Sequence, residues 1–321
     1  MNEPAHDQRA AEGAAERGEA GVLLAAFYHF APLDDCRDLK GPMQQRCEDL
    51  GLLGTILLAR EGINGTVAGP ERGVHRLLRR LREDTRLAGL KAKFSRAPEA
   101  PFHRMKVRLK QEIVSLGVPG VDPTAAVGEY VSPEDWNALI ARDDVRLIDT
   151  RNDYEVELGT FRGAENPDTR SFRDFPAWAR DHLDPERDEH VAMFCTGGIR
   201  CEKSTAWLKS LGFRNVYHLD GGILNYLERI DPEESAWEGD CFVFDNRVTV
   251  DAALRPGNLE ICPACRRPLT EADRASPKFE RHVCCPSCFD RLTPEKRAGL
   301  LERARQIELA ARRGERHLGG G

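Results

Sequence analysis

The chain has 321 residues, with 47 basic and 53 acidic side chains and a formal net charge of −6. Hydrophobic residues make up 40% of it, which suffices for ordinary cores and excludes global disorder. The length indicates two or three domains rather than one. The longest apolar stretch, 51–59, is too short to cross a bilayer, and the first 21 residues lack the apolar centre of a signal peptide. We therefore expect a cytoplasmic protein.

The N-terminal third has the pattern of a small α/β domain. Residues 1–20 show no periodicity and are expected to form a disordered tail. Residues 21–116 alternate extended and helical patterns in a βαββαβ-like order, which is typical of the ferredoxin-like unit. The predicted strands are 23–30, 55–58, 66–68, 90–94 and 105–113, and the predicted helices are 33–50 and 73–86.

A linker rich in Gly, Pro and Val, 117–130, precedes a second unit at 131–230. Its first helix begins at Ser132, a good N-cap followed by proline. Strands then alternate with helices, which predicts a mostly parallel sheet covered on both faces. The predicted strands are 146–149, 190–194 and 215–219, and the helical segments are 172–183 and 202–211. A cysteine-rich segment with a charged helix, 231–321, completes an α/β chain of three parts.

One loop of the second unit carries the pattern of a reactive thiol. A buried-type strand ends at Cys195, and a helix follows Arg200. Between them, consecutive glycines allow backbone N–H groups to curl inward into an anion-binding nest, which stabilises a thiolate. The remaining loop residues are Thr196, Gly197, Gly198 and Ile199. The alternative is that Cys195 is a small buried apolar residue that ends a strand.

The spacing of this loop, Cys-x4-Arg, is one residue shorter than the Cys-x5-Arg loop of phosphatases. The tighter ring suits a single extra atom on the sulfur, as in a persulfide. Cys201 either resolves such a persulfide as a disulfide with Cys195 or packs at the start of the helix. Asp149 and Arg151, at the end of another strand, either orient the loop by ion pairing or have a purely structural role.

The net negative charge conceals a basic segment. Residues 70–112 contain 13 basic and 5 acidic side chains, a local charge of +8, which leaves 34 basic and 48 acidic residues, or −14, elsewhere. Basic residues alternate with apolar ones at Arg104, Lys106, Arg108 and Lys110. On a strand these four share one face, which suits an RNA backbone and predicts strong salt dependence. The alternative is an edge strand that its charges protect from aggregation. A nearby aromatic run, 27–30, resembles a base-stacking platform, although alternate residues should face the core.

The ten cysteines are unevenly placed, and five of them lie within 262–288. In a reducing compartment, metal binding or catalysis is a better explanation than disulfides. Two Cys-x2-Cys pairs with 19 residues between them favour a structural zinc site. These pairs are Cys262 with Cys265 and Cys285 with Cys288. The alternatives are cysteines that bind nothing or a redox pair. There is no nucleotide, flavin or haem signature.

Residues 132–230 resemble a rhodanese domain. The resemblance rests on Asp149-Thr150-Arg151 with Glu155, on the segments 159–164 and 218–222, and on the loop 195–200, although Phe161-Arg162 replaces the commoner His-Ile. In that family the loop cysteine takes up sulfane sulfur as a persulfide.

A wider resemblance covers nearly the whole chain beyond the tail. The segments GTILLAREGINGT (54–66), FHRMKVRLK (102–110) and CTGGIRCEK (195–203) resemble the oxygen-dependent tRNA uridine hydroxylase family. This resemblance implies hydroxylation of the wobble uridine to 5-hydroxyuridine, with O₂ as co-substrate and the anticodon arm of tRNA as partner. It also implies dependence on Cys195.

Several alternatives stay open at the level of sequence. Cys195 acts either as a persulfide carrier or as a covalent nucleophile at the pyrimidine ring. A rival enzyme is a sulfurtransferase that passes sulfane sulfur to a thiol or to tRNA. A rival from another class is a non-catalytic module that binds RNA or anions. The sequence does not indicate an oligomeric state.

Overall fold

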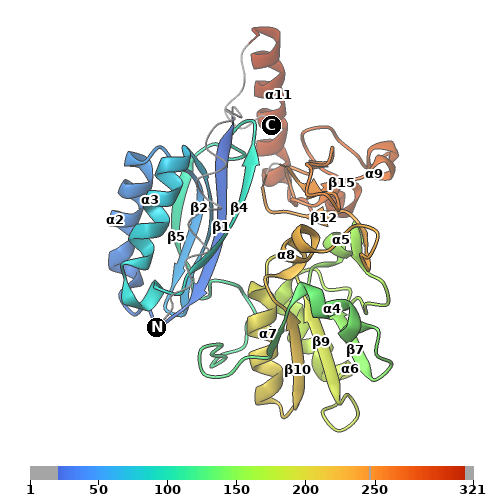
Figure 1. The fold of residues 1–321 in the computed structure, drawn as a ribbon. Helices are drawn as coiled ribbons and strands as arrows, with labels where there is room; N and C mark the ends of the chain where they lie inside the picture. The colour runs from blue at the N-terminus through green and yellow to red at the C-terminus, as the bar shows by residue number, and fades with distance from the viewer. Residues whose placement is uncertain (1–20, 246, 315–321) are drawn as a thin grey trace.

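The computed structural model describes residues 21–245 and 247–314. The predicted tail at 1–20 lies outside the described residues. Figure 1 shows an N-terminal domain, a rhodanese-like domain and a small C-terminal module arranged around a common centre. None of the described helices combines the length and the apolar character that a membrane span requires.

The N-terminal domain is a five-stranded sheet with two helices on one face (Figure 1). The strand order is β4-β1-β3-β2-β5, and all neighbours are antiparallel except β2 and β5. The first four strands have the ferredoxin-like order, so that prediction is confirmed, and β5 widens the sheet. The strands are β1 (Val22–Phe30), β2 (Leu53–Ala59), β3 (Gly62–Gly69), β4 (Lys91–Ala97) and β5 (Met105–Leu109). The helices are α2 (Cys36–Asp49) and α3 (Glu71–Arg82), followed by the 3₁₀ turn η1 (Thr85–Leu87).

Alternation along the strands divides the N-terminal domain into two faces. On β1, Ala25 and Phe27 pack into the core beneath α2 and α3, while Tyr28 lies on the opposite face. The predicted last strand, 105–113, is shorter than expected. Its final ladder bond joins the Lys110 N–H to the Leu58 carbonyl at 2.8 Å, after which the chain turns toward the next domain.

The rhodanese-like domain has a wholly parallel four-stranded sheet, in the order β6-β10-β9-β7. Helices cover both faces, which confirms the predicted two-sided architecture. Its sheet strands are β6 (Glu129–Val131), β7 (Val145–Asp149), β9 (His190–Phe194) and β10 (Asn215–Leu219). Its helical elements are α4 (Pro133–Ile140), α5 (Asp153–Val156), η2 (Phe172–Asp174), α6 (Phe175–His182), α7 (Ile199–Ser210) and α8 (Gly222–Arg229).

The N-termini of two helices show how the local sequence determines where helices begin in this domain. Ser132 accepts a hydrogen bond from the Asp135 N–H at 3.2 Å and caps α4 as predicted. Helix α7 begins at Ile199, three residues before its predicted start, because Gly198 adopts φ +101° at the N-cap and turns the chain directly into the helix.

The C-terminal module consists of short strand pairs and three helices. Strand β11 (Trp237–Gly239) pairs with β8 (Gly159–Phe161) of the rhodanese-like domain. The other elements are β12 (Cys241–Phe242), β13 (Thr249–Val250), β14 (Glu260–Ile261), β15 (Pro268–Leu269), α9 (Glu271–Ala275), α10 (Pro286–Phe289) and α11 (Pro294–Arg312). Four cysteines form much of its small core, while α11 projects away from the rest of the molecule (Figure 1).

A buried lysine joins the first two domains. Lys203, on α7, is 1% exposed and donates to Glu61 at 2.7 Å and to Glu112 at 2.6 Å. The Glu61 carboxylate also accepts the N–H of Ile113 at 2.6 Å, and the amide of Asn64 donates to the Ile113 carbonyl at 3.0 Å. Two of the three segments that carry the wider family resemblance, 54–66 and 195–203, therefore meet at this interface, where the helix-free face of the N-terminal sheet faces the Cys195 loop.

Candidate active site

The loop at the end of β9 curls around the sulfur of Cys195. The Gly198 N–H donates to Sγ at 3.1 Å, and the Cys195 side chain is fully buried. The loop is anchored to α8, since the Ile223 N–H donates to the Cys195 carbonyl at 3.0 Å. Gly222 permits this approach, because it has φ +68° and a Cβ there would lie 2.3 Å from that carbonyl oxygen.

The environment of Cys195 favours the thiolate. Burial opposes ionisation, but the hydrogen bond from Cys201 and the charge of Arg200 outweigh it and lower the pKa of Cys195 to about 5. Burial and the neighbouring thiolate raise the pKa of Cys201 well above its usual value. At neutral pH the pair therefore consists of a thiolate at Cys195 and a thiol at Cys201 that donates to it.

Arg200 is held by a carboxylate that sequence reasoning did not select as a site residue. Its guanidinium donates to both oxygens of Glu155, at 2.6 and 2.8 Å, and both side chains are buried. Thr196 also donates to Glu155, at 3.3 Å. Burial raises the pKa of Glu155, but Arg200 more than offsets this and lowers it. The sequence offered one signal for this role, because Glu155 is part of the rhodanese pattern. The pattern does not indicate that Glu155 pairs with Arg200.

Asp149 and Arg151 form a separate buried pair. Arg151 donates to Asp149 at 2.6 and 2.9 Å and to the Gly159 carbonyl, and its guanidinium lies 5.0 Å from the ring centroid of Trp237. Within the described chain, their hydrogen bonds do not reach the loop 195–200. The pair therefore stabilises the packing of α5, β8 and β11 rather than the sulfur of Cys195.

A pocket of about 790 Å³ lies between the helix-free face of the N-terminal sheet and the Cys195 loop. The residues that form it come from all three parts of the chain. Its polar and aromatic lining includes Tyr28, Asn64, Lys91, Lys93, Tyr130, Arg200, Glu202, Phe244 and Arg247. Cys195 forms part of its wall. A cavity of this size and composition can hold a nucleotide.

Two polar groups in the pocket come from outside the predicted site. The Lys93 ammonium lies 3.5 Å from the Gly197 carbonyl, and burial lowers the pKa of Lys93 to about 8. The Tyr28 hydroxyl donates to Glu202 at 2.7 Å, and burial raises the pKa of Glu202. Tyr130 is a second hydrogen-bond partner of this carboxyl group. Sequence reasoning missed Lys93 because only the domain interface brings it to the loop. It missed Glu202, two residues after Arg200 on α7, because its partner Tyr28 comes from β1 of the other domain.

The predicted basic row lies at the sheet edge. Arg104, Arg108 and Lys110 are exposed, and Lys106 is half-buried. Met105 and Val107 between them are buried beneath the helices, whereas Leu109, the next apolar residue of the alternation, is 37% exposed and lies outside the core. Lys106 pairs in register with Thr55, and Arg108 with Leu57, and both of these partners line the pocket. The basic row therefore continues the face that forms one wall of the pocket.

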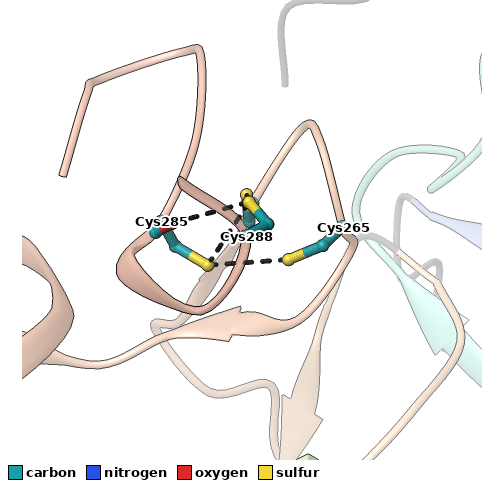
Figure 2. Close-up of side chains that lie close together, drawn as sticks. Cys265, Cys285 and Cys288 are labelled. Carbon is teal, nitrogen blue, oxygen red and sulfur yellow. Dashed lines mark hydrogen bonds between the residues drawn. The ribbon is translucent and has the colours of Figure 1, made fainter. Parts of the chain in front are cut away.

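The four C-terminal cysteines converge on one point. The sulfurs of Cys262, Cys265, Cys285 and Cys288 all lie within 4.8 Å of one another. Figure 2 shows the thiols of Cys265, Cys285 and Cys288 turned toward each other, with 3.5 Å between Cys265 and Cys285 and 3.9 Å between Cys285 and Cys288. Four sulfurs about 2.3 Å from a tetrahedral zinc ion would be about 3.8 Å apart, so the set fits zinc.

Family models match the two larger domains of the chain. Residues 22–113 match the UPF0176 acylphosphatase-like domain, and residues 132–229 match the rhodanese-like domain. A solved rhodanese-like domain from Anabaena covers 34% of this chain and 78% of its own, at 19% identity and a TM-score of 0.29.

Two curated relatives extend over almost the whole chain. The protein from Teredinibacter turnerae is 53% identical over 297 residues, covering 92% of each chain. The protein from Gluconobacter oxydans is 54% identical over 302 residues, covering 93% of this chain and 96% of its own. Both are named tRNA uridine(34) hydroxylase. At this identity and coverage, the chain belongs to the tRNA uridine(34) hydroxylase family.

Proposed function

We propose that this protein hydroxylates the wobble uridine of tRNA to 5-hydroxyuridine, with O₂ as co-substrate and Cys195 as the essential thiol. The supporting observation is a buried thiolate in the wall of a nucleotide-sized pocket, in a chain that matches relatives of that activity over 92% of its length. The uridine enters this pocket after leaving the stack of the anticodon loop, because a base within a stack cannot reach a buried sulfur.

Two roles of Cys195 are compatible with this geometry. As a nucleophile, its sulfur adds to C6 of the uracil and the electron pair of the C5=C6 bond moves onto C5 and O4. Lys93, whose ammonium belongs to the same pocket, offers a positive charge that stabilises this enolate. As a persulfide carrier, the Cys195 thiolate attacks the outer sulfur of a sulfane donor, whose thiolate or sulfite leaves, and Cys195 then carries one extra sulfur atom at the wall of the pocket. Mass spectrometry separates them: tRNA with 5-fluorouridine at position 34 forms a Cys195 adduct in the first case, and resting Cys195 carries one extra sulfur atom in the second.

Nucleoside mass spectrometry tests the function itself. A deletion strain is complemented with the wild-type protein or with Cys195→Ser, and its tRNA is digested. We expect 5-hydroxyuridine-derived nucleosides to be restored only by the wild type. Normal hydroxylation with a loss of thionucleosides would instead identify a sulfurtransferase. Rescue by Cys195→Ser would leave only a binding function.

The basic row supports a path for the anticodon arm. Lys106 and Arg108 continue the wall of the pocket, and burial together with neighbouring positive charges, including Arg266 of the C-terminal module, lowers the pKa of Lys106. Cations gathered in this way suit a phosphate backbone. We propose that Arg104, Lys106, Arg108 and Lys110 contact the arm while its wobble base occupies the pocket.

We also propose that Cys262, Cys265, Cys285 and Cys288 hold one structural zinc ion. The support is the convergence of four thiols in a small module, where three of these cysteines are buried in the core and Cys265 packs against it. Metal analysis of the purified protein should find about one zinc per chain. A value near zero would reject the site.

The division of the chain and its location complete the proposal. We propose domains at 21–116 and 131–230, a linker at 117–130 and a C-terminal segment at 231–321. As an enzyme of tRNA, the protein would act in the cytoplasm.

A further inference from the structure

We infer that Arg267 of the four-cysteine module is a positioning residue for the Cys195 loop, to which it is connected through helix α5. The inference rests on the proposed function only for its activity measurement, since the state of the thiol can be measured without tRNA. It rests on a continuous series of contacts that begins at the turn formed by residues 262–267, here called the cysteine turn, and ends at Arg200.

The cysteine turn fixes the backbone of Arg267. Arg267 lies two residues after Cys265, and its carbonyl accepts the N–H of Cys262 at 2.8 Å. The N–H of Arg266 in turn donates to the Cys262 carbonyl at 2.9 Å. These reciprocal bonds close the loop that presents the first two thiols, so the direction in which Arg267 leaves the module is set by the ligand turn.

Arg267 then reaches across to the rhodanese-like domain. Its guanidinium donates to Asp153 at 2.8 Å and to Glu157 at 3.2 Å, and it lies 5.4 Å from the ring centroid of Tyr154. The Arg267 side chain is only 19% exposed, and that of Asp153 13%. The three contacted residues lie on or next to a single element, α5.

Helix α5 needs such support because it contains only four residues. A helix of one turn has almost no stability of its own and keeps its position only through external contacts. Arg267 holds its surface side, while its inward residue Glu155 binds both nitrogens of Arg200. Arg200 belongs to the sulfur loop, and its charge is one cause of the lowered pKa of Cys195. A shift of α5 therefore moves the positive charge that stabilises the thiolate.

The test measures the pH dependence of Cys195 alkylation by mass spectrometry of the Cys195 peptide, in the full-length protein. In Arg267→Met we expect the midpoint of the rate profile to rise by about one pH unit. We also expect kcat for tRNA hydroxylation to fall roughly tenfold with KM little changed, since substrate contacts remain. Zinc content should equal that of the wild type.

Two further variants keep the inference falsifiable. Arg274→Met removes an ion pair with Glu260 that lies wholly within the C-terminal module, and it should leave both the midpoint and kcat unchanged. If Arg267→Met fails to fold, Asp153→Asn with Glu157→Gln breaks the same contact from the α5 side and should raise the midpoint equally. A wild-type midpoint in a folded, metal-loaded Arg267 or α5 variant would overturn the inference. If the wild-type protein hydroxylates no tRNA, the proposed function is rejected. The pH midpoint of Cys195 alkylation in the variants would still test this inference.

Discussion

Cys195 keeps a negative charge in a fully buried position, and one of the groups that stabilise this charge is another buried cysteine. The hydrogen bond from Cys201 is the largest contribution that lowers the pKa of Cys195, ahead of the charge of Arg200. A thiol that serves as a donor must itself stay protonated, and burial ensures this by raising its pKa. The structure thus gives Cys201 a defined role in the resting site.

This arrangement predicts the effect of removing that donor. Cys201→Ala should raise the pH midpoint of Cys195 alkylation from about 5 by about one unit, because the thiolate loses a hydrogen bond while its burial is unchanged. The matched variant Cys201→Ser keeps a donor and should stay near the wild-type midpoint. Equal midpoints for the alanine variant and the wild type would contradict this role.

The lowered pKa of Lys93 predicts that the activity of the enzyme falls at alkaline pH as well as at acidic pH. Cys195 is a thiolate above a pH of about 5, and Lys93 is charged below a pH of about 8. If both charges are needed, kcat/KM is bell-shaped, falling at low pH as the thiolate is protonated and at high pH as the ammonium loses its proton. Lys93→Met should remove the alkaline limb and lower the maximum about tenfold.

The control for this variant lies on the same strand. Arg96 is a basic residue of β4 that pairs with Glu71 of α3, away from the pocket. Arg96→Met should therefore retain both limbs. An alkaline limb that persists in Lys93→Met would assign it to another group.

At the scale of elements, a buried bridge joins α7 to the β2–β3 turn and to the segment that follows β5. Lys203→Met would leave the Glu61 and Glu112 carboxylates facing each other with no cation between them. We expect the free energy of unfolding to fall by about 3 kcal/mol, measured by urea denaturation. Lys209→Met, an exposed position on the same helix, should change it by less than about 0.5 kcal/mol. Comparable stabilities of the two variants would argue against the bridge.

The elements also show what the sequence does and does not specify. Period and turn signals predicted the ferredoxin-like order and the parallel sheet, because local pattern and burial agree there. The predicted end of β5 and the predicted start of α7 each lie several residues from the observed positions. A bend of the chain toward the next domain ends β5, and the left-handed conformation of Gly198 starts α7. In the aromatic run 27–30, Phe27 and Phe30 are buried in different clusters and the two residues between them are half-buried, so burial does not alternate as predicted. Only the tertiary structure shows that Tyr28 meets Glu202.

The candidate site likewise contains residues that the sequence pattern predicted and residues that only the fold brings together. The Cys195 loop is contiguous in sequence, so its glycines, arginine and cysteines were visible as a pattern. Glu155, Lys93 and Glu202 lie 40, 102 and 7 positions away from Cys195, and the first two come from other strands and helices. Their partners are set by long-range packing, within the rhodanese-like domain for Glu155 and between domains for Lys93 and Glu202, which no local pattern encodes.

At the scale of the whole molecule, the structure separates the basic charge into two populations. The segment of +8 includes the α3 arginines on the helix face, and on the pocket side it includes the β5 row together with Lys91 and Lys93 of β4. Lys91 and Lys93 line the pocket and the β5 row adjoins it, whereas the α3 arginines lie on the opposite face. The predicted RNA surface is therefore narrower than the charge distribution in the sequence implies.

Binding of tRNA at different salt concentrations tests this division. Replacing Lys106 and Arg108 with alanine should weaken binding and reduce the slope of log K against log salt by about 0.7–0.9 for each phosphate that is no longer neutralised. Replacing Arg76 and Arg79, two exposed residues of α3, removes the same charge from the other face and should change the slope little. Equal effects of the two double variants would indicate attraction by overall charge rather than a defined path.

The pocket shared by the N-terminal sheet and the Cys195 loop has a consequence for how the protein can be divided. A chain cut between residues 117 and 128 would yield two fragments, each with only part of the lining. Neither fragment would turn over tRNA alone, and a mixture would recover activity in proportion to the amount of reassembled pair. The protein is thus a natural starting point for a split reporter, in which catalysis records the proximity of two fused partners.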